Sequence, residues 1–367
     1  MKVVTCPEVC RYGGGEEVIP AGERLVIPDW AAQSIALACR DDGSHPRITD
    51  ARHYTRPYFG QDLDGKRLIA RRGLGIGDQL VFAGVLAILK RLYPQASIDT
   101  YSYPGVHEAL WEGADDLPFR ALPEPILFDE DWQKADYHLI ADGWCECDKE
   151  PDQPSMWDGH LQCSGLDPDE IPAEWRVPVV PVTVEDFNSA FDARPHGLAV
   201  LWQVAASTPV RTYRPNLTLR AMELLRAEYS DVEIIATGSP KQLDAMELPA
   251  GMRTTEGLSL RAVMALAGMV DAVVCPDSYL GHVTAAHGTP TVSLWSSFLP
   301  ADRVGSYTCH RPLVGEIECS PCRHHEKTKT CQGCPKTWED EHASRYCEGL
   351  ARIAPEEIVE AVKEIVR

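Results

Sequence analysis

The chain has 367 residues, of which 44% are hydrophobic and 25% charged, proportions that exclude a disordered, collagen-like or coiled-coil protein. Its 35 Lys and Arg against 55 Asp and Glu give a net charge of −20, which disfavours nucleic acid as a partner. No apolar run reaches the about 20 residues of a membrane span, and the first ten residues lack a signal-peptide core. We therefore expect a cytoplasmic protein without a membrane span, whose 13 cysteines are thiols or metal ligands.

Residues 1–60 differ from the rest of the chain and predict a small β-β-α appendage with a linker. The apolar run 24–27 predicts a strand, and Asp29 is a suitable N-cap for a short helix over 30–38. The stretch 40–64 is polar and rich in Gly and Pro, which is typical of a linker. This part resembles small modules found in bacteriophage proteins.

Residues 61–180 predict a first domain of alternating strands and helices. Expected strands at 67–70, 97–103 and 137–141 frame a helix with apolar residues from Leu80 to Leu92 on one broad face. Such βαβ order implies a mostly parallel sheet.

A second α/β domain is expected over 181–350, after a stretch at 167–186 that is rich in Pro and acidic residues. A final helix over 351–367 begins at Pro355 and carries one apolar stripe. The other elements expected in this domain are strands at 198–203, 232–236, 272–275 and 291–295, and helices at 219–228, 260–267 and 279–287.

The first candidate site is Gly73-x-Gly75-x-Gly77-Asp78, between an expected strand and an expected helix. Glycines let a ligand approach the backbone, and the free amides of a helix start favour an anion. The spacing is not that of the G-x-G-x-x-G dinucleotide fingerprint. A structural turn with a stabilising carboxylate at the helix start is the alternative.

Two further candidates follow strands of the second domain. Thr237-Gly238-Ser239-Pro240 and Cys275-Pro276-Asp277-Ser278 each lead from an expected strand into a helix, where ligands bind in α/β sheets. Asp277, Ser278 and the bare amides of the second helix suit a ligand's hydroxyl groups or diphosphate, and His282 lies one turn further on. Ordinary strand-to-helix turns, and a packed rather than ligand-binding His282, are the alternatives.

These motifs, taken in order, resemble glycosyltransferase family 9, which includes lipopolysaccharide heptosyltransferases. The likeness covers about residues 66–367 and rests on the following segments: Gly75-Ile76-Gly77-Asp78-Gln79-Leu80, Leu89–Pro94, Thr237–Pro240, Leu258-Ser259-Leu260, Asp277–Pro290 and the cysteines from Cys319 onward. It implies a GT-B fold, in which two Rossmann-like domains face a cleft, the first binding the acceptor and the second the nucleotide sugar.

The resemblance also implies inverting sugar transfer that needs no metal or other cofactor. Asp78 matches the family's proposed general base, while Arg211, and after it Arg214, take the place of a lysine that faces the diphosphate. An inverting reaction needs a carboxylate for the acceptor proton and positive charge for the departing diphosphate. The expected donor-binding residues are Gly77, Arg214, Gly238, Ser239, Leu258, Asp277, Ser278 and His282.

The donor is expected to be an ADP- or UDP-sugar, and the acceptor a surface glycan of the lipopolysaccharide type. Other possible acceptors are a small molecule, a protein and a modified base of phage DNA. A DNA acceptor would need a locally basic surface, which Arg67, Arg71 and Arg72 could supply. Tyr279, Gly281 and Ser296 depart from the family pattern, so a non-catalytic sugar- or nucleotide-binding protein is the alternative function. Asp62-x-Asp64 suggests a metal-dependent transferase only weakly, because it lies in the linker.

The cysteine-rich loop at 319–347 is a candidate zinc site. Cys319-x-x-Cys322 and Cys331-x-x-Cys334 are two pairs that suit a tetrahedral structural zinc. Substitute ligands are His324, His325 and Cys347, and the alternative is a loop of reduced thiols.

Overall fold

The computed structural model describes residues 1–5, 10–12, 17–19, 23–27, 32, 47–51, 55–73, 75–114, 116–141, 154–194, 197–323 and 346–366. These residues form two compact units. Unit 1 comprises residues 1–74, 85–143 and 161–167, and unit 2 comprises 75–84, 144–160 and 168–367. The first half of the helix that carries Asp78 therefore belongs to unit 2, whereas its second half belongs to unit 1.

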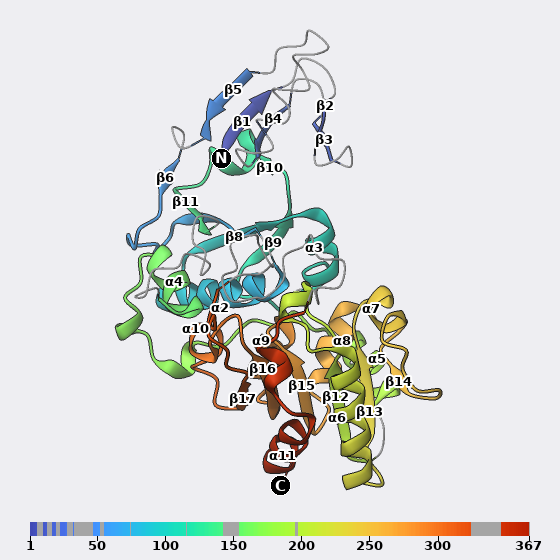
Figure 1. Ribbon diagram of the computed structural model, residues 1–367. Coiled ribbons are helices and arrows are strands. Elements are labelled where there is room, and N and C mark those ends of the chain that lie inside the picture. Colours follow the sequence, from blue (N-terminus) through green and yellow to red (C-terminus); the bar gives the residue numbers. More distant parts are fainter. Residues whose placement is uncertain are drawn as a thin grey trace. The chain divides into compact units, whose positions relative to one another are not determined.

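Unit 2 is built on a six-stranded, fully parallel sheet in the order β14-β13-β12-β15-β16-β17 (Figure 1). Its strands confirm the four that the sequence predicts and add two edge strands. The bounds are β12 (Ala199–Gln203), β13 (Glu233–Thr237), β14 (Arg253–Thr254), β15 (Ala272–Pro276), β16 (Thr291–Trp295) and β17 (His310–Val314).

One face of this sheet packs against α6 (Pro215–Glu228) and α11 (Pro355–Ile365). Alternate strand residues such as Val200, Trp202 and Val274 share a core with both helices, while the residues between them are buried on the opposite face. A sheet covered on both faces explains why these strands read as continuous apolar runs.

The other helices of unit 2 include α5 (Val184–Ala193), α8 (Leu260–Ala267) and α9 (Tyr279–His287), of which α8 packs against both of the others. Thr183 caps α5, and Ser259 caps α8 by accepting from the amide of Ala262. The shorter elements are α4 (Met156–Cys163, shared with unit 1), η5 (Pro168–Glu170), η6 (Ala173–Trp175), η7 (Pro209–Arg211), α7 (Pro240–Asp244), α10 (Pro300–Arg303) and η8 (Leu350–Arg352).

Unit 1 holds a five-stranded parallel sheet in the order β6-β11-β7-β8-β9. The three strands that the sequence predicts are present. The elements are β6 (Arg56–Pro57), β7 (Arg67–Arg71), α2 (Ile76–Leu92, shared with unit 2), β8 (Ser97–Ser102), α3 (Pro104–Leu110), β9 (Arg120–Pro123) and β11 (Tyr137–Ile140).

The amino-terminal strands β1, β4 and β5 form an antiparallel sheet with β10 from residues 126–127, in the order β10-β4-β1-β5, and β2 and β3 form a separate hairpin. Residues Val3, Val26 and Ala51 share one hydrophobic cluster with Ile69 and Trp132 of the rest of unit 1, so this appendage packs on the first α/β layer. The bounds are β1 (Lys2–Thr5), β2 (Cys10–Tyr12), β3 (Glu17–Ile19), β4 (Arg24–Ile27), β5 (Arg47–Asp50), β10 (Ile126–Leu127) and the π-helix η3 (Phe128–Trp132).

Two predictions for this region need comment. The stretch 40–64 is not simply a linker, because β5 within it pairs with β1 and β6 pairs with β11, and short polar strands are hard to recognise without their partners. The helix expected over 30–38 lies almost wholly outside the described residues.

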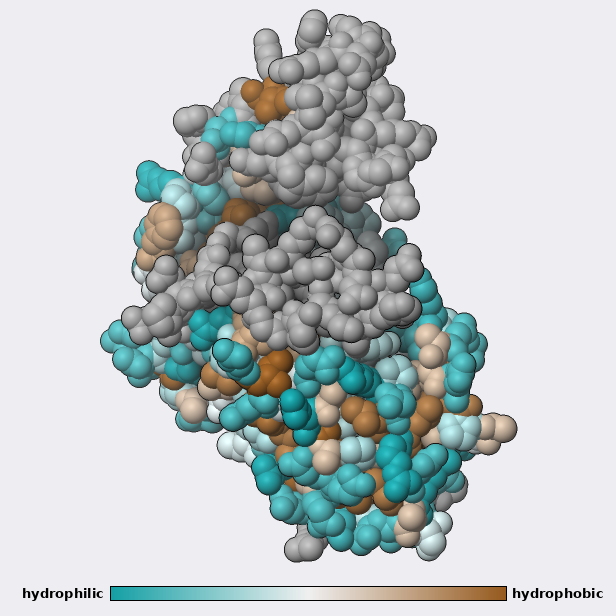
Figure 2. Space-filling model, viewed as in Figure 1, coloured by the Kyte–Doolittle hydropathy of each residue, from teal (hydrophilic) through white to brown (hydrophobic). Residues whose placement is uncertain are grey.

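Among the described residues, no helix is long and apolar enough to cross a membrane. In the view of Figure 2, hydrophilic residues are spread over much of the coloured surface, with smaller hydrophobic groups between them.

Candidate functional site

The carboxyl edge of the six-stranded sheet gathers most of the predicted donor-binding residues. Because all strands are parallel, the residues that follow β12, β13, β14 and β15 emerge at the same edge. Ser278 begins α9 after β15, and its hydroxyl group donates to Oε1 of Gln203, the last residue of β12, at 2.5 Å. The chain thus brings two neighbouring strand ends into direct contact.

Gly238, Ser239 and Leu258 lie at this edge too. Gly238 and Ser239 follow β13, and Leu258 follows β14, where its amide donates to the carbonyl oxygen of Thr255. The Ser239 amide donates to the side chain of Gln242, the third residue of the short helix α7. Ser239 and Leu258 therefore have local structural partners in the described chain, and the role of all three residues in binding a donor stays a prediction.

Asp277 is buried between two arginines. Its Oδ2 lies 3.6 Å from Nη1 of Arg211, and its Oδ1 lies 3.5 Å from Nη1 of Arg303. Arg303 also stacks on the ring of Phe298, with its guanidinium carbon 4.1 Å from the ring centroid. Two guanidinium groups thus flank one carboxylate at the start of α9.

The two arginines predicted to face a diphosphate lie in different surroundings. Arg211 ends η7 and its Nη1 also approaches the carbonyl oxygen of Asp277, at 3.4 Å. Arg214 instead pairs with Glu348, at 2.5 Å. The sequence analysis did not identify Arg303, because no motif surrounds it. Only in the folded chain does α10, which contains Arg303, lie near Asp277 at the end of β15.

The start of α2 lies against the start of α9. A Cβ atom on Gly77 would lie 2.9 Å from Cδ2 of His282 and 3.5 Å from Cα of Tyr279, so any side chain at position 77 would collide. Asp78 follows Gly77 and is partly exposed, with its Oδ2 3.3 Å from the position of a Cβ on Gly75. The structure therefore brings the predicted base and the predicted phosphate-binding helix together within unit 2.

His282 is buried beneath this contact and is neutral near pH 7. Burial, and the positive charge of Arg303, lower its pKa to about 4, although the negative charges of Asp277 and Asp78 act in the opposite direction. Its Nδ1 lies 2.9 Å from the hydroxyl oxygen of Tyr307, and that oxygen accepts a hydrogen bond from Nε1 of Trp157 at 2.9 Å. The sequence predicts His282 at the site but gives no sign of Tyr307 or Trp157.

The surroundings of Gly281 and Ser296, two of the residues that depart from the family pattern, are defined in the structure. A Cβ on Gly281 would lie 3.2 Å from Cε1 of His310, whose Nε2 lies 3.0 Å from the Gly281 carbonyl oxygen. Ser296 is buried beyond the end of β16, where its hydroxyl group lies 3.5 Å from Sγ of Cys347. The two contacts with His310 make a larger residue at position 281 unfavourable in this chain.

The cysteine loop is described only in part. Cys319 and Cys322 are half-buried, and Cys347 is packed in the core of unit 2, where its Sγ lies 3.5 Å from the Ser296 hydroxyl group. Cys331, Cys334, His324 and His325 lie outside the described residues. Within the described residues there is no group of three or more His, Cys, Asp or Glu side chains that suits a metal ion.

The other polar clusters have local roles. Oδ1 of Asp62 accepts from the amide of Asp64 within an exposed turn. In unit 1, Arg67 pairs with Asp99 and Asp131, and Arg71 with Glu124.

Arg72, the third arginine considered for a basic surface, is fully buried and donates to the carbonyl oxygen of Ala141. Arg71 and Arg72 are therefore interior groups, and the basic surface considered for a nucleic-acid acceptor is not formed by these three arginines.

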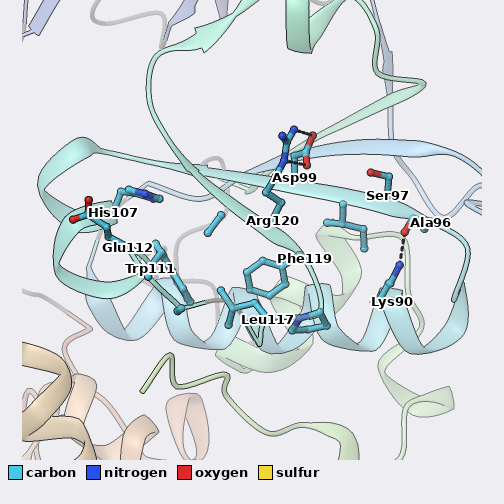
Figure 3. Close-up of a pocket in the computed structure, with 15 residues that line it drawn as sticks. Lys90, Ala96, Ser97, Asp99, His107, Trp111, Glu112, Leu117, Phe119 and Arg120 are labelled. Carbon is cyan, nitrogen blue, oxygen red and sulfur yellow. Dashed lines mark hydrogen bonds and ion pairs between the residues drawn. The ribbon is translucent and has the colours of Figure 1, made fainter. Parts of the chain in front are cut away.

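A cavity of about 610 Å³ lies in unit 1 near α3, at the amino ends of β8 and β9 (Figure 3). Arg120 there points to Asp99, and Lys90 donates to the carbonyl oxygen of Ala96. Ligands of parallel α/β sheets bind at the opposite, carboxyl edge, so this cavity is not the candidate site.

Comparisons with known proteins bear on the family and the fold. Residues 228–332 match the family model described as glycosyltransferase family 9 (heptosyltransferase). This segment includes β13, β15, α9 and Asp277. No protein with a curated functional description matches the chain in sequence.

Several solved structures are similar. The ADP-heptose lipopolysaccharide heptosyltransferase II of E. coli has a TM-score of 0.60 and 15% identity, over 82% of this chain and 98% of that one. A family 9 glycosyltransferase from Veillonella parvula has a TM-score of 0.58 and 12% identity, over 83% and 98%. The iron-containing dodecameric glycosyltransferase TibC from enterotoxigenic E. coli has a TM-score of 0.58 and 10% identity, over 99% and 91%. The expected GT-B fold and the resemblance to family 9 are confirmed.

Proposed function

We propose that this chain, which carries a segment of glycosyltransferase family 9 on a GT-B fold, is an inverting glycosyltransferase. It moves a sugar from a nucleotide-sugar donor to a hydroxyl acceptor. One observation carries the proposal: the start of α2, with Asp78, lies directly against the start of α9, as the approach of Gly77 to His282 and Tyr279 demonstrates. A proton acceptor and a helix start suited to phosphate are thereby adjacent.

In the proposed reaction the Asp78 carboxylate takes the proton of the acceptor hydroxyl. The acceptor oxygen then bonds to the anomeric carbon from the face opposite the leaving group, and the bond between that carbon and the diphosphate oxygen breaks. Attack from the opposite face inverts the configuration at this carbon. The electron pair of the broken bond leaves with the nucleoside diphosphate.

Arg211 and the amides at the start of α9 stabilise the departing diphosphate in this proposal. Asp277 supports this arrangement because it holds Arg211 at 3.6 Å and Arg303 at 3.5 Å beside Ser278. This positive charge is what a reaction without an obligatory metal needs. We propose an ADP-sugar as the donor, since the names of two similar structures include ADP-heptose, and a UDP-sugar as the alternative.

A surface glycan of the lipopolysaccharide type is the proposed acceptor. Arg67 and Arg71 are neutralised by carboxylates and Arg72 is buried, which disfavours a phage DNA base. A non-catalytic protein that binds sugar or nucleotide is the other candidate function, and it shares the donor site but predicts no turnover.

A panel of ADP-, UDP-, GDP- and CMP-sugars tests the donor site. We expect one nucleotide class to raise Tm and to be hydrolysed slowly without an acceptor. Arg211→Ala should weaken its binding by at least about 10-fold, because one charge-assisted contact to phosphate is lost. Arg220→Ala, on the exposed side of α6, is the matched control and should bind normally. No shift with any donor contradicts the proposal, and a shift without hydrolysis or transfer favours the binding protein.

We also propose that the cysteine loop holds a structural metal. Thiolates suit both zinc and iron, and TibC, which is similar over 99% of this chain, is described as iron-containing. Cys319 and Cys322 fit one half of such a site, since both are half-buried and two residues apart. Ser320 and Arg323 tie this segment to the loop after β16, where they bond to the carbonyl oxygens of Ser296 and Ser297.

Elemental analysis of the purified protein tests this site. We expect about one zinc or iron per chain, since four thiolates complete a tetrahedral site, and loss of the metal when Cys319 and Cys322 are both changed to Ser. Cys163→Ser in unit 1 is the control and should keep the metal. A wild-type protein with neither element overturns the proposal, and the element found decides between zinc and iron.

A further inference from the structure

A chain of three buried side chains leads from α4 to the proposed reaction centre. Trp157 of α4, Tyr307 after α10 and His282 of α9 are all at least nine-tenths buried. The distances are 2.9 Å from Trp157 Nε1 to the Tyr307 oxygen and 2.9 Å from that oxygen to His282 Nδ1. All three residues belong to unit 2.

The directions of these hydrogen bonds follow from the groups themselves. An indole N–H only donates, so the Tyr307 oxygen accepts from Trp157. The described residues offer the Tyr307 hydroxyl no acceptor other than His282 Nδ1. If His282 donated instead, the buried Tyr307 hydrogen would have no acceptor, which is costly. Tyr307 therefore donates to Nδ1, and the ring hydrogen of the neutral His282 is on Nε2.

The Nε2 atom faces the start of α2. It lies 3.3 Å from the position of a Cβ on Gly77, the residue before Asp78. The described residues form no hydrogen bond with Nε2, and the residue as a whole is 3% exposed. The imidazole thus directs its Nε2–H group at the backbone of Gly77, one residue before the proposed base.

We infer that Trp157 and Tyr307 are positioning residues that hold His282 in the Nε2–H form, so that it donates a hydrogen bond to a substrate oxygen next to Asp78. This inference rests on the proposed function for the identity of the substrate, but the state of His282 is independent of it. Gly77 permits the approach, because any side chain at that position would occupy the space in front of the imidazole ring.

NMR of protein labelled with ¹⁵N-histidine tests the assignment without a substrate. The chain has 12 histidines, so the His282 signals are identified by their loss in His282→Gln. Near pH 7 we expect a neutral ring with hydrogen on Nε2 in the wild type, and a mixture of the two tautomers in Tyr307→Phe. Hydrogen on Nδ1, or a charged ring, in the wild type overturns the inference.

Kinetics with the donor found in the panel supply the second measurement. Tyr307→Phe should lower kcat about 10-fold with little change in KM, the scale seen for residues that orient a functional group. Trp157→Phe keeps the donation by Tyr307 and should have a smaller effect. Unchanged kcat and tautomer in Tyr307→Phe would refute a positioning role.

Tyr213→Phe is the matched control. It also removes a buried tyrosine hydroxyl of unit 2, which donates to the carbonyl oxygen of Ile353 at 2.7 Å. We expect a comparable fall in Tm but the wild-type tautomer and kcat. An inactive protein with the Nε2–H form would contradict the proposed function alone, whereas an active protein with the Nδ1–H form would contradict this inference alone.

Discussion

Asp78→Asn is expected to lower turnover by at least about 100-fold while nucleotide-sugar binding is kept. Asparagine has nearly the size of aspartate, but its amide does not accept the proton of an acceptor hydroxyl. Asp78 lies at the third position of α2 and is partly exposed, so the substitution should affect the fold little. The measurements are kcat for sugar transfer and the rise in Tm with donor.

Asp231→Asn is the control for this substitution. Asp231 is exposed and precedes β13, at the amino edge of the sheet, whereas the candidate site is at the carboxyl edge. Turnover should stay at the wild-type level in this variant. If Asp78→Asn turns over as fast as the wild type, Asp78 is not the general base.

Glu124→Gln is expected to reduce the stability of unit 1 by about 3 kcal/mol, which corresponds to a fall in Tm of roughly 6 to 12 °C. Glu124 Oε1 accepts from Arg71 Nε at 2.5 Å, and the side chains are 4% and 1% exposed. Removing the carboxylate leaves the guanidinium charge buried without its counter-charge. Differential scanning calorimetry or unfolding in urea measures the loss.

Two controls separate the buried charge from other effects. Arg71→Met combined with Glu124→Gln removes both charges and should recover part of the lost stability. Glu223→Gln breaks an exposed pair with Arg220 and should change stability by less than about 1 kcal/mol. An unchanged Tm in Glu124→Gln would mean that Arg71 is not neutralised internally, and a basic acceptor surface would have to be reconsidered.

Much of unit 2 is predictable from local sequence. Helices α8 and α9 have the bounds expected from their apolar residues, and the strands of the central sheet lie within about one residue of the predicted ones. Buried parallel strands are short apolar runs between turns, so their signal is strong. The appendage was harder, since β5 is polar and is defined by pairing with β1.

For the candidate site, the sequence identified the residues that lie in motifs but not the partners that surround them. Asp78, Asp277 and Ser278 follow strands or begin helices, and their positions relative to glycine and proline are visible in the chain. Arg303 and Tyr307 are distant from any motif, yet they contact Asp277 and His282. Arg214 is a predicted phosphate ligand, and the sequence did not reveal that it pairs with Glu348.

The sequence by itself determined the α/β class, the order of the strands along the chain and the chemistry available at their ends, because periodicity and turn residues act locally. Only the tertiary structure decided which charges meet: that Asp277 lies between Arg211 and Arg303, and that Gly77 lies against His282. The reason is that these contacts join segments that are distant in the chain, up to about 200 residues for Gly77 and His282. The energies of such contacts depend on burial and on distances of a few ångströms, which local sequence does not specify.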